Sequence, residues 1–156
     1  MKTPDSSTLM EPLRGLDAIE LESAVGLWLR LAQQKDLRGF NRAFAEHRIS
    51  QVQYAVLLVI EANPGCRQAD LGAVLRIRQP NLVEPLEMLV ERGLIDRRTD
   101  PRDRRAQTLG LTAAGRDLLE RLRRSHDELI GSYRRRLGDD GYRQLVQLLR
   151  ALVEGA

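Results

Sequence analysis

The chain has 156 residues, of which 30% are charged and 4% aromatic, and its formal net charge is +3. This length suits one domain with a hydrophobic core and is short for two. The abundance of Leu, Ala and Arg favours a mainly helical soluble protein, and no apolar run approaches the roughly 18 residues that a membrane span requires.

Residues 1–15 show no helical or strand periodicity, so we expect a flexible N-terminal segment before a single domain over residues 16–156. This segment lacks the apolar core of a signal peptide, and one cysteine cannot form an internal disulfide. Both features predict a cytoplasmic protein. Apolar residues then recur at helical spacing, which predicts a long helix over about residues 17–47.

Ser50 and Gln53 have the spacing of a capping box, which predicts a second helix that Pro64-Gly65 ends. A short helix follows in the sequence QADLGAVLR. Two prolines then stand five residues apart in RIRQPNLVEPLEML, residues 76–89, within a helical leucine pattern. Asn81 is a good N-cap with Glu84 three residues later, so we expect the helix to begin after Pro80. Pro85 then removes at most one helical hydrogen bond.

The prolines allow two interpretations. They could hold the backbone so that Arg78, Gln79 and Asn81 reach a partner, or they could only shape the turn between two packed helices.

Two short extended segments, LIDRRT and AQTLGLT, flank DPRDRR and predict a β-hairpin. Residues 92–105 hold six arginines against three aspartates. Such a charge run is usually a solvated surface, although arginine also pairs well with phosphate. After the hairpin, Thr112 is expected to cap a long helix that Gly138 breaks, and a last helix should follow.

This order of elements predicts a mainly α winged helix-turn-helix fold over about residues 50–112, with a small β-hairpin wing. In such modules the second helix of the motif lies in the DNA major groove. Residues 70–115 resemble the core of the MarR family of bacterial transcription regulators. The most specific pieces are LVERGLIDR and DPRDRRAQTLGLTAAG.

The resemblance implies a homodimer built from terminal helices over about residues 17–47 and 113–155, bound to a palindromic operator and usually acting as a repressor. It also implies that Arg105 enters the minor groove and that Asp103 holds it. The chain departs from the family at Val83, Glu84 and Pro85, where Thr or Arg is usual. The predicted DNA-binding residues are Arg76, Arg78, Gln79, Asn81, Arg98, Arg102, Asp103, Arg104 and Arg105.

The resemblance further implies a small-molecule effector, which in many relatives is an aromatic acid or its coenzyme A thioester. Because the first, second and fifth helices wall the effector pocket in this family, it makes four residues candidate ligand contacts. They are Trp28, Arg38, His47 and Tyr54.

The residues also bear on three other functions. Cys66 could serve a thiol-based redox sensor, but it follows Pro-Gly where a short strand should pack, which favours a buried structural cysteine. His47 and His126 have no partner at metal-ligand spacing, and no nucleophile with its base is evident, so we expect neither a metal or cofactor nor an enzyme. A helical protein-interaction module without DNA binding would leave the basic hairpin unexplained.

Overall fold

The computed structural model describes residues 24–100 and 103–154, and the chain forms two compact units, Met1–Arg38 and Gly39–Ala156. The predicted boundary between residues 15 and 16 lies outside the described residues. Helix α2 spans Val25–Ala43, and a 3-10 turn, η3, follows at Ala45–His47. The predicted helical segment therefore ends close to His47, where Arg48 adopts a left-handed conformation with φ 51°.

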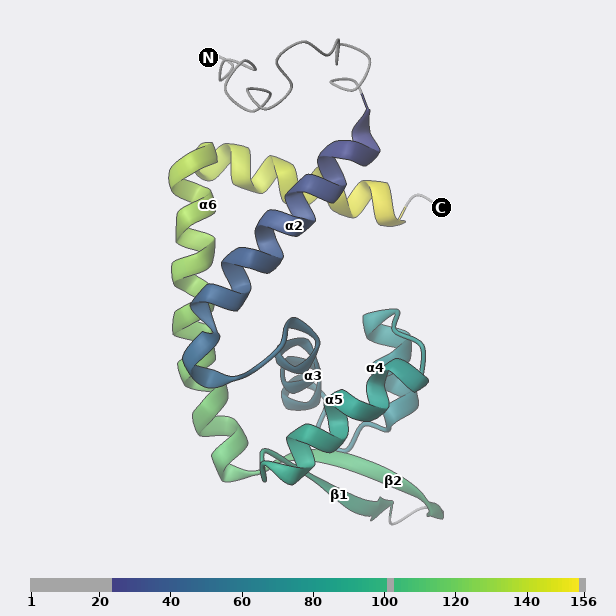
Figure 1. Ribbon diagram of the computed structural model, residues 1–156. Helices are drawn as coiled ribbons and strands as arrows, with labels where there is room; N and C mark the ends of the chain where they lie inside the picture. The colour runs from purple at the N-terminus through teal and green to yellow at the C-terminus, as the bar shows by residue number, and fades with distance from the viewer. Residues whose placement is uncertain (1–23, 101–102, 155–156) are drawn as a thin grey trace. The chain divides into compact units, whose positions relative to one another are not determined.

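The second unit holds the predicted winged helix, with a mainly helical body and a two-stranded antiparallel sheet (Figure 1). Its remaining elements are α3 (Gln51–Ala62), α4 (Gln68–Leu75), α5 (Pro80–Glu91), β1 (Ile95–Asp100), β2 (Asp103–Leu111) and α6 (Ala113–Glu154). The predicted fold class is confirmed.

Local signals in the sequence set the start of two helices. At α3 the Gln53 amide donates to Ser50 Oγ at 3.2 Å, and the Ser50 amide donates to Gln53 Oε1 at 2.9 Å. At α6 the Gly115 amide donates to Thr112 Oγ1 at 3.0 Å. Gly138 interrupts α6 with φ 71° and ψ 161°. All three predictions are confirmed.

The predicted start of α5 is wrong. Pro80 occupies the first helical position and Gln79 precedes it without a side-chain cap, so Asn81 lies inside the helix. Proline suits this position because its φ is already helical and its missing N–H would have no intrahelical acceptor there. The Asn81 amide donates to the carbonyl of Arg78 at 2.9 Å, which satisfies it without a side chain. Glu84 therefore has no capping role.

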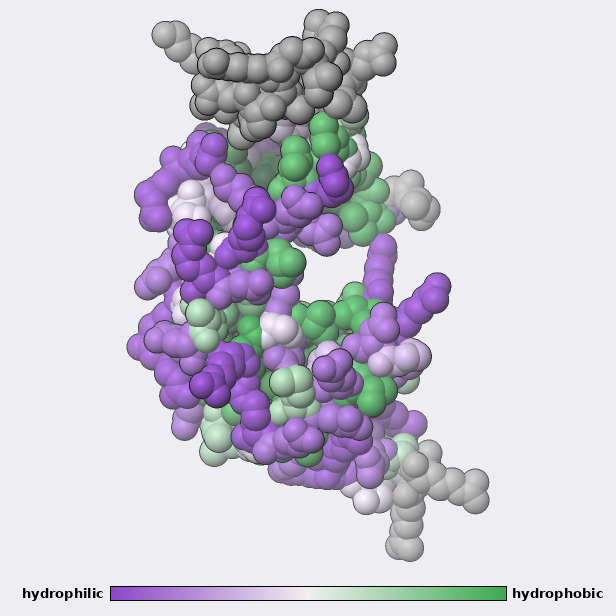
Figure 2. All heavy atoms as spheres, in the orientation of Figure 1, coloured by the Kyte–Doolittle hydropathy of each residue, from purple (hydrophilic) through white to green (hydrophobic). Residues whose placement is uncertain are grey.

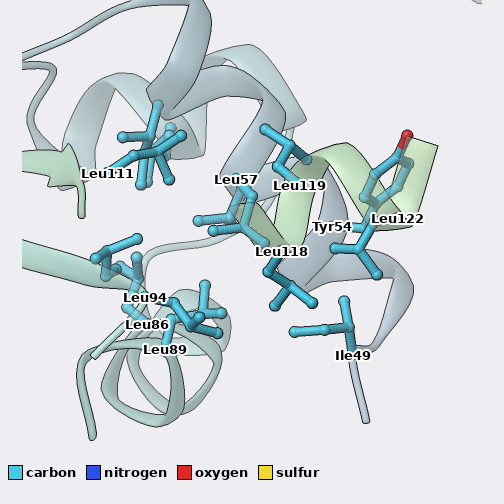
Figure 3. Packing of buried hydrophobic residues seen from close by; sticks show 14 of the residues in the cluster. Ile49, Tyr54, Leu57, Leu86, Leu89, Leu94, Leu111, Leu118, Leu119 and Leu122 are labelled. Atoms are coloured by element: carbon cyan, nitrogen blue, oxygen red, sulfur yellow. The ribbon is translucent and has the colours of Figure 1, made fainter. Parts of the chain in front are cut away.

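Leucines from three helices form the centre of the core of the second unit (Figure 3). Leu57 of α3, Leu86 of α5, and Leu119 and Leu122 of α6 are fully buried. Each such side chain stabilises the fold by about 1.5–3 kcal/mol relative to exposure. The leucine spacing of α5 is thus kept although Pro85 lies inside the helix.

The hairpin is anchored to this core at its base. Ile95 pairs with Leu111, both are buried, and the register shifts between Thr99 and Asp100 near the tip. Arg67 forms an isolated bridge with Thr108, so a single bridge residue takes the place of the short strand predicted after Pro64-Gly65. Strand β2 of the wing is therefore paired on both sides, with β1 and with the segment before α4.

Candidate nucleic-acid interface

The turn between α4 and α5 is built by close backbone contacts. Arg76 ends α4 in a left-handed conformation with φ 52°, and the Ile77 amide donates to the carbonyl of Gly72 at 3.0 Å. Gln79 Nε2 donates to the carbonyl of Gln68 at 3.2 Å. A Cβ at Gly72 would lie 2.4 Å from that same Nε2 atom, so glycine is required for this approach. The Gln79 side chain thus fastens α4 to α5.

The first turns of α5 present a different set of side chains to solvent. Asn81, Val83 and Glu84 are exposed, whereas Leu82 is buried. Arg76 and Arg78 are exposed just before the helix. In the view of Figure 2 the surface over α5 and the hairpin is mostly hydrophilic. The structure therefore brings Arg76, Arg78 and Asn81 to one exposed end of α5.

The wing carries an ion pair that was not predicted. Arg98 donates from Nε and Nη2 to Asp96 Oδ2, at 3.0 and 2.7 Å. Asp96 Oδ1 is buried without a hydrogen-bond partner in the part of the chain that the structure describes. The sequence does contain a signal for this pair. Asp-Arg-Arg at residues 96–98 repeats the Asp-Arg-Arg of the wing motif at residues 103–105. Aspartate thus orients an exposed arginine on β1.

The remaining wing residues are only partly covered. Arg102 lies outside the described residues. Asp103, Arg104 and Arg105 belong to strand β2, but their side chains are not among those described. Their roles stay predictions.

Two of the predicted effector residues lie in one aromatic cluster of the second unit. The Phe44 ring is 5.1 Å from the Tyr54 ring and 6.4 Å from the His47 ring, between centroids. His126 lies 5.4 Å from Tyr54, and His47 Nε2 is 3.3 Å from Ser125 Oγ. Burial raises the pKa of the Tyr54 phenol, so it stays a neutral hydrogen-bonding group. Trp28 and Arg38 belong to the first unit, and both are exposed there.

The end of α5 is tied to the same region. Arg92 donates from Nη1 to the carbonyl of Arg48 at 2.7 Å and from Nη2 to the carbonyl of His47 at 2.9 Å. This contact joins the helix of the proposed DNA interface to the segment that precedes α3. It was not predicted, because the partners are 44 and 45 residues apart in the chain.

Cys66 is half-buried, not fully buried as expected. It packs against the core on one side and on the other lines a shallow groove of about 380 Å³ with Val59, Asn63, Pro64, Gly65, Asp70 and Val74. Burial, and to a lesser extent the Asp70 carboxylate, raises the pKa of the thiol. Since the thiolate is the reactive form, these surroundings disfavour redox sensing.

No group of three His, Cys, Asp or Glu side chains within residues 24–100 and 103–154 is arranged to hold a metal ion. Within the same residues, no helix combines the length and the hydropathy needed to cross a bilayer.

A helix pair with a tight turn, followed by a hairpin anchored in the same core, defines a winged helix-turn-helix protein. The MarR family model matches residues 49–106. A protein of Thauera aromatica proposed to regulate transcription of the hcr operon is 32% identical over 150 residues, which cover 96% of this chain and 88% of that protein. The chain belongs to the MarR family. It is a transcriptional regulator and not an enzyme.

Solved structures agree with this assignment. The transcriptional repressor CouR, bound to a 23-mer DNA duplex, superposes with a TM-score of 0.85 at 32% identity, over 88% of this chain and 98% of CouR. CouR bound to p-coumaroyl-CoA gives a TM-score of 0.80 at 30% identity, over 88% of this chain and 97% of CouR.

Proposed function

We propose that this regulator is a dimeric repressor that binds a palindromic operator and is released from it by a small aromatic effector. The observation that carries the proposal is the exposed start of α5 beside an arginine-rich wing, on a fold that matches a repressor bound to DNA. In this arrangement α5 enters the major groove, and the wing reaches the adjacent minor groove or its phosphates.

An apolar surface near the end of α6 supports the dimer. The segment after Gly138 exposes large aliphatic side chains, between 38% and 61% of each, at helical spacing. A monomer would leave this surface in water, whereas a second copy would cover it. A two-fold dimer also explains how two α5 helices meet the two halves of a palindrome. The exposed residues are Leu145, Val146, Leu148, Leu149, Leu152 and Val153.

The wing supplies a test of DNA binding. Replacing Arg105 by Ala should weaken binding to the operator and to random duplex by similar factors, because a wing arginine responds to groove shape and phosphate charge more than to base identity. The slope of log affinity against log salt concentration should fall in magnitude by about 0.9 if one phosphate contact is lost.

Fluorescence anisotropy at several salt concentrations measures both quantities. Arg136→Ala is the matched control, because it removes the same charge from an exposed position on α6. If Arg105→Ala changed neither affinity nor slope, the wing would be a solvated charge run without contact to DNA.

An effector of the aromatic acid or aromatic acyl-CoA class is supported by the similarity to CouR, whose structure holds p-coumaroyl-CoA. Tyr54 and His47 remain the candidate contacts in the second unit, and Trp28 and Arg38 in the first. Aromatic rings and arginine suit an aromatic anion, because they offer stacking and charge pairing.

Titration with p-coumaroyl-CoA and p-coumaric acid should quench the fluorescence of Trp28, the chain's single tryptophan, and release operator DNA over the same concentration range. Acetyl-CoA is the control, because it carries the coenzyme without an aromatic acyl group. Quenching without release of DNA would separate the ligand site from regulation and contradict the proposal.

A further inference from the structure

We infer that α5 reads its operator half-site through Val83 and Glu84, with Val83 against a thymine methyl group and Glu84 accepting from the N4 amino group of a cytosine. This inference rests on the proposed function and adds the base chemistry of the operator to it.

The position of both side chains follows from the observed start of α5. Because the helix begins at Pro80, Val83 and Glu84 are its fourth and fifth residues, at the end that a recognition helix turns to the bases. Val83 is 41% exposed and Glu84 is exposed, while the neighbouring Leu82 and Leu86 are fully buried. The core therefore holds α5 with these two side chains outward.

The side chains of Val83 and Glu84 are both exposed to solvent. Glu84 makes no hydrogen bond or ion pair with any residue in the described ranges. The capping box that it was expected to form with Asn81 is absent. Val83 is a β-branched apolar side chain exposed to water between the exposed Asn81 and Glu84. An exposed valine and an unpaired carboxylate at this end of the helix are available to a ligand.

The chemistry of α5 restricts which bases it can recognise. Its sequence PNLVEPLEMLVE contains no arginine or lysine, and Asn81 is its single amide side chain. Guanine offers acceptors in the major groove and is usually read by arginine or lysine. A carboxylate instead accepts from the cytosine amino group, and an aliphatic side chain contacts the thymine methyl. Val83 and Glu84 thus fit pyrimidines.

Glu84 would also reject wrong bases. Thymine and guanine present carbonyl oxygens to the major groove, and an unpaired carboxylate facing one of them is unfavourable. The exposed Arg76 and Arg78 lie just before the helix and can offset the repulsion between Glu84 and the phosphates. The carboxylate then contributes specificity without preventing binding.

The experiment starts with operators selected from a randomised duplex library by the full-length wild-type protein. Replacing each thymine of the half-site by deoxyuridine removes a methyl group and leaves base pairing intact. One replacement should weaken wild-type binding about fourfold, the equivalent of about 0.8 kcal/mol for one buried carbon. Val83→Ala should bind the thymine and uracil duplexes equally well.

Glu84 is tested by exchanging each cytosine–guanine pair of the selected half-site. At one pair, wild type should lose at least about fivefold, the lower end of the range for a good base contact. Glu84→Gln should lose most of this discrimination and bind random duplex more tightly, because the repelling charge is gone. Glu91→Gln, which removes the same charge at the other end of α5, should keep the wild-type preference.

The outcomes separate this inference from the proposed function. If the library yields no selected operator, the proposed function fails. If wild type binds a selected operator but tolerates every uracil replacement, or if Glu84→Gln keeps the full base preference, the base assignment is wrong and DNA binding stands.

Discussion

Replacing Gly115 by Ala should destabilise the second unit by about 3 kcal/mol, the upper end of the usual cost of overpacking. A Cβ at this position would lie 2.0 Å from the carbonyl oxygen of Leu94 and 3.0 Å from its carbonyl carbon. Both atoms belong to the backbone and cannot move as a flexible side chain would. The substitution should therefore push the start of α6 away from β1.

The contacts around Gly115 would be lost together. Thr112 Oγ1 accepts from the Gly115 amide at 3.0 Å and donates to the carbonyl of Gly93 at 2.7 Å. The Thr112 amide donates to the carbonyl of Leu94 at 3.1 Å. One residue at the start of α6 thus caps that helix and joins it to the turn before the wing.

Urea denaturation followed by circular dichroism measures the change at one fixed protein concentration, because dimerisation couples stability to concentration. Gly131→Ala on the same helix is the matched control. Its Cβ would meet nothing nearer than the end of the Arg135 side chain at 3.4 Å. Alanine there should be neutral or stabilising by up to about 1 kcal/mol, as expected inside a helix. Equal midpoints for both variants would contradict the predicted clash.

Replacing Leu149 by Arg should convert the protein from a dimer to a monomer at micromolar concentration and weaken operator binding at least about 100-fold. Leu149 lies among the exposed aliphatic residues after Gly138 and is itself 38% exposed. A buried arginine without a partner is costly, so the two copies should separate. A monomer then loses the gain of about 10²–10⁴ that comes from binding two half-sites at once.

Sedimentation velocity measures the association, and anisotropy with whole and half operators measures binding. Gln147→Arg is the matched control, because it adds the same charge at an exposed polar position of the same segment and should leave the dimer intact. A wild-type protein that sediments as a monomer and still binds the whole operator tightly would exclude the proposed assembly.

Local chemistry explains which features could be read from the chain alone. Ser50 with Gln53, Thr112 at the start of α6 and Gly138 within it act on neighbours a few residues away, so their spacing in the sequence was sufficient. The hairpin could also be predicted from the sequence, because two extended segments flank a turn within a short stretch of chain. These signals together determined the winged helix and, with the wing motif, the family.

Tertiary contacts decided the details of the DNA interface. The sequence predicts Gln79 as a DNA-binding residue and Glu84 as a partner in the helix cap. The residues near them in the chain do not indicate whether these roles are correct. The Gln79 side chain instead donates to the carbonyl of Gln68, 11 residues away across the α4–α5 turn. Because Pro80 begins the helix, Glu84 does not form a capping box with Asn81. Packing therefore engages the side chain that was expected to read bases and leaves the expected cap exposed.

The sequence by itself determined the order of elements, the mainly helical class and the arginine-rich wing, because hydrophobic spacing, capping and turn chemistry are local. Only the tertiary structure decided that Gly115 must lack a side chain, that Arg92 binds the carbonyls of His47 and Arg48, and that Cys66 is half-buried. Each of these depends on atoms from segments far apart in the chain. The packing of the core determines how closely these segments approach one another. The spacing of residues along the chain does not predict that distance.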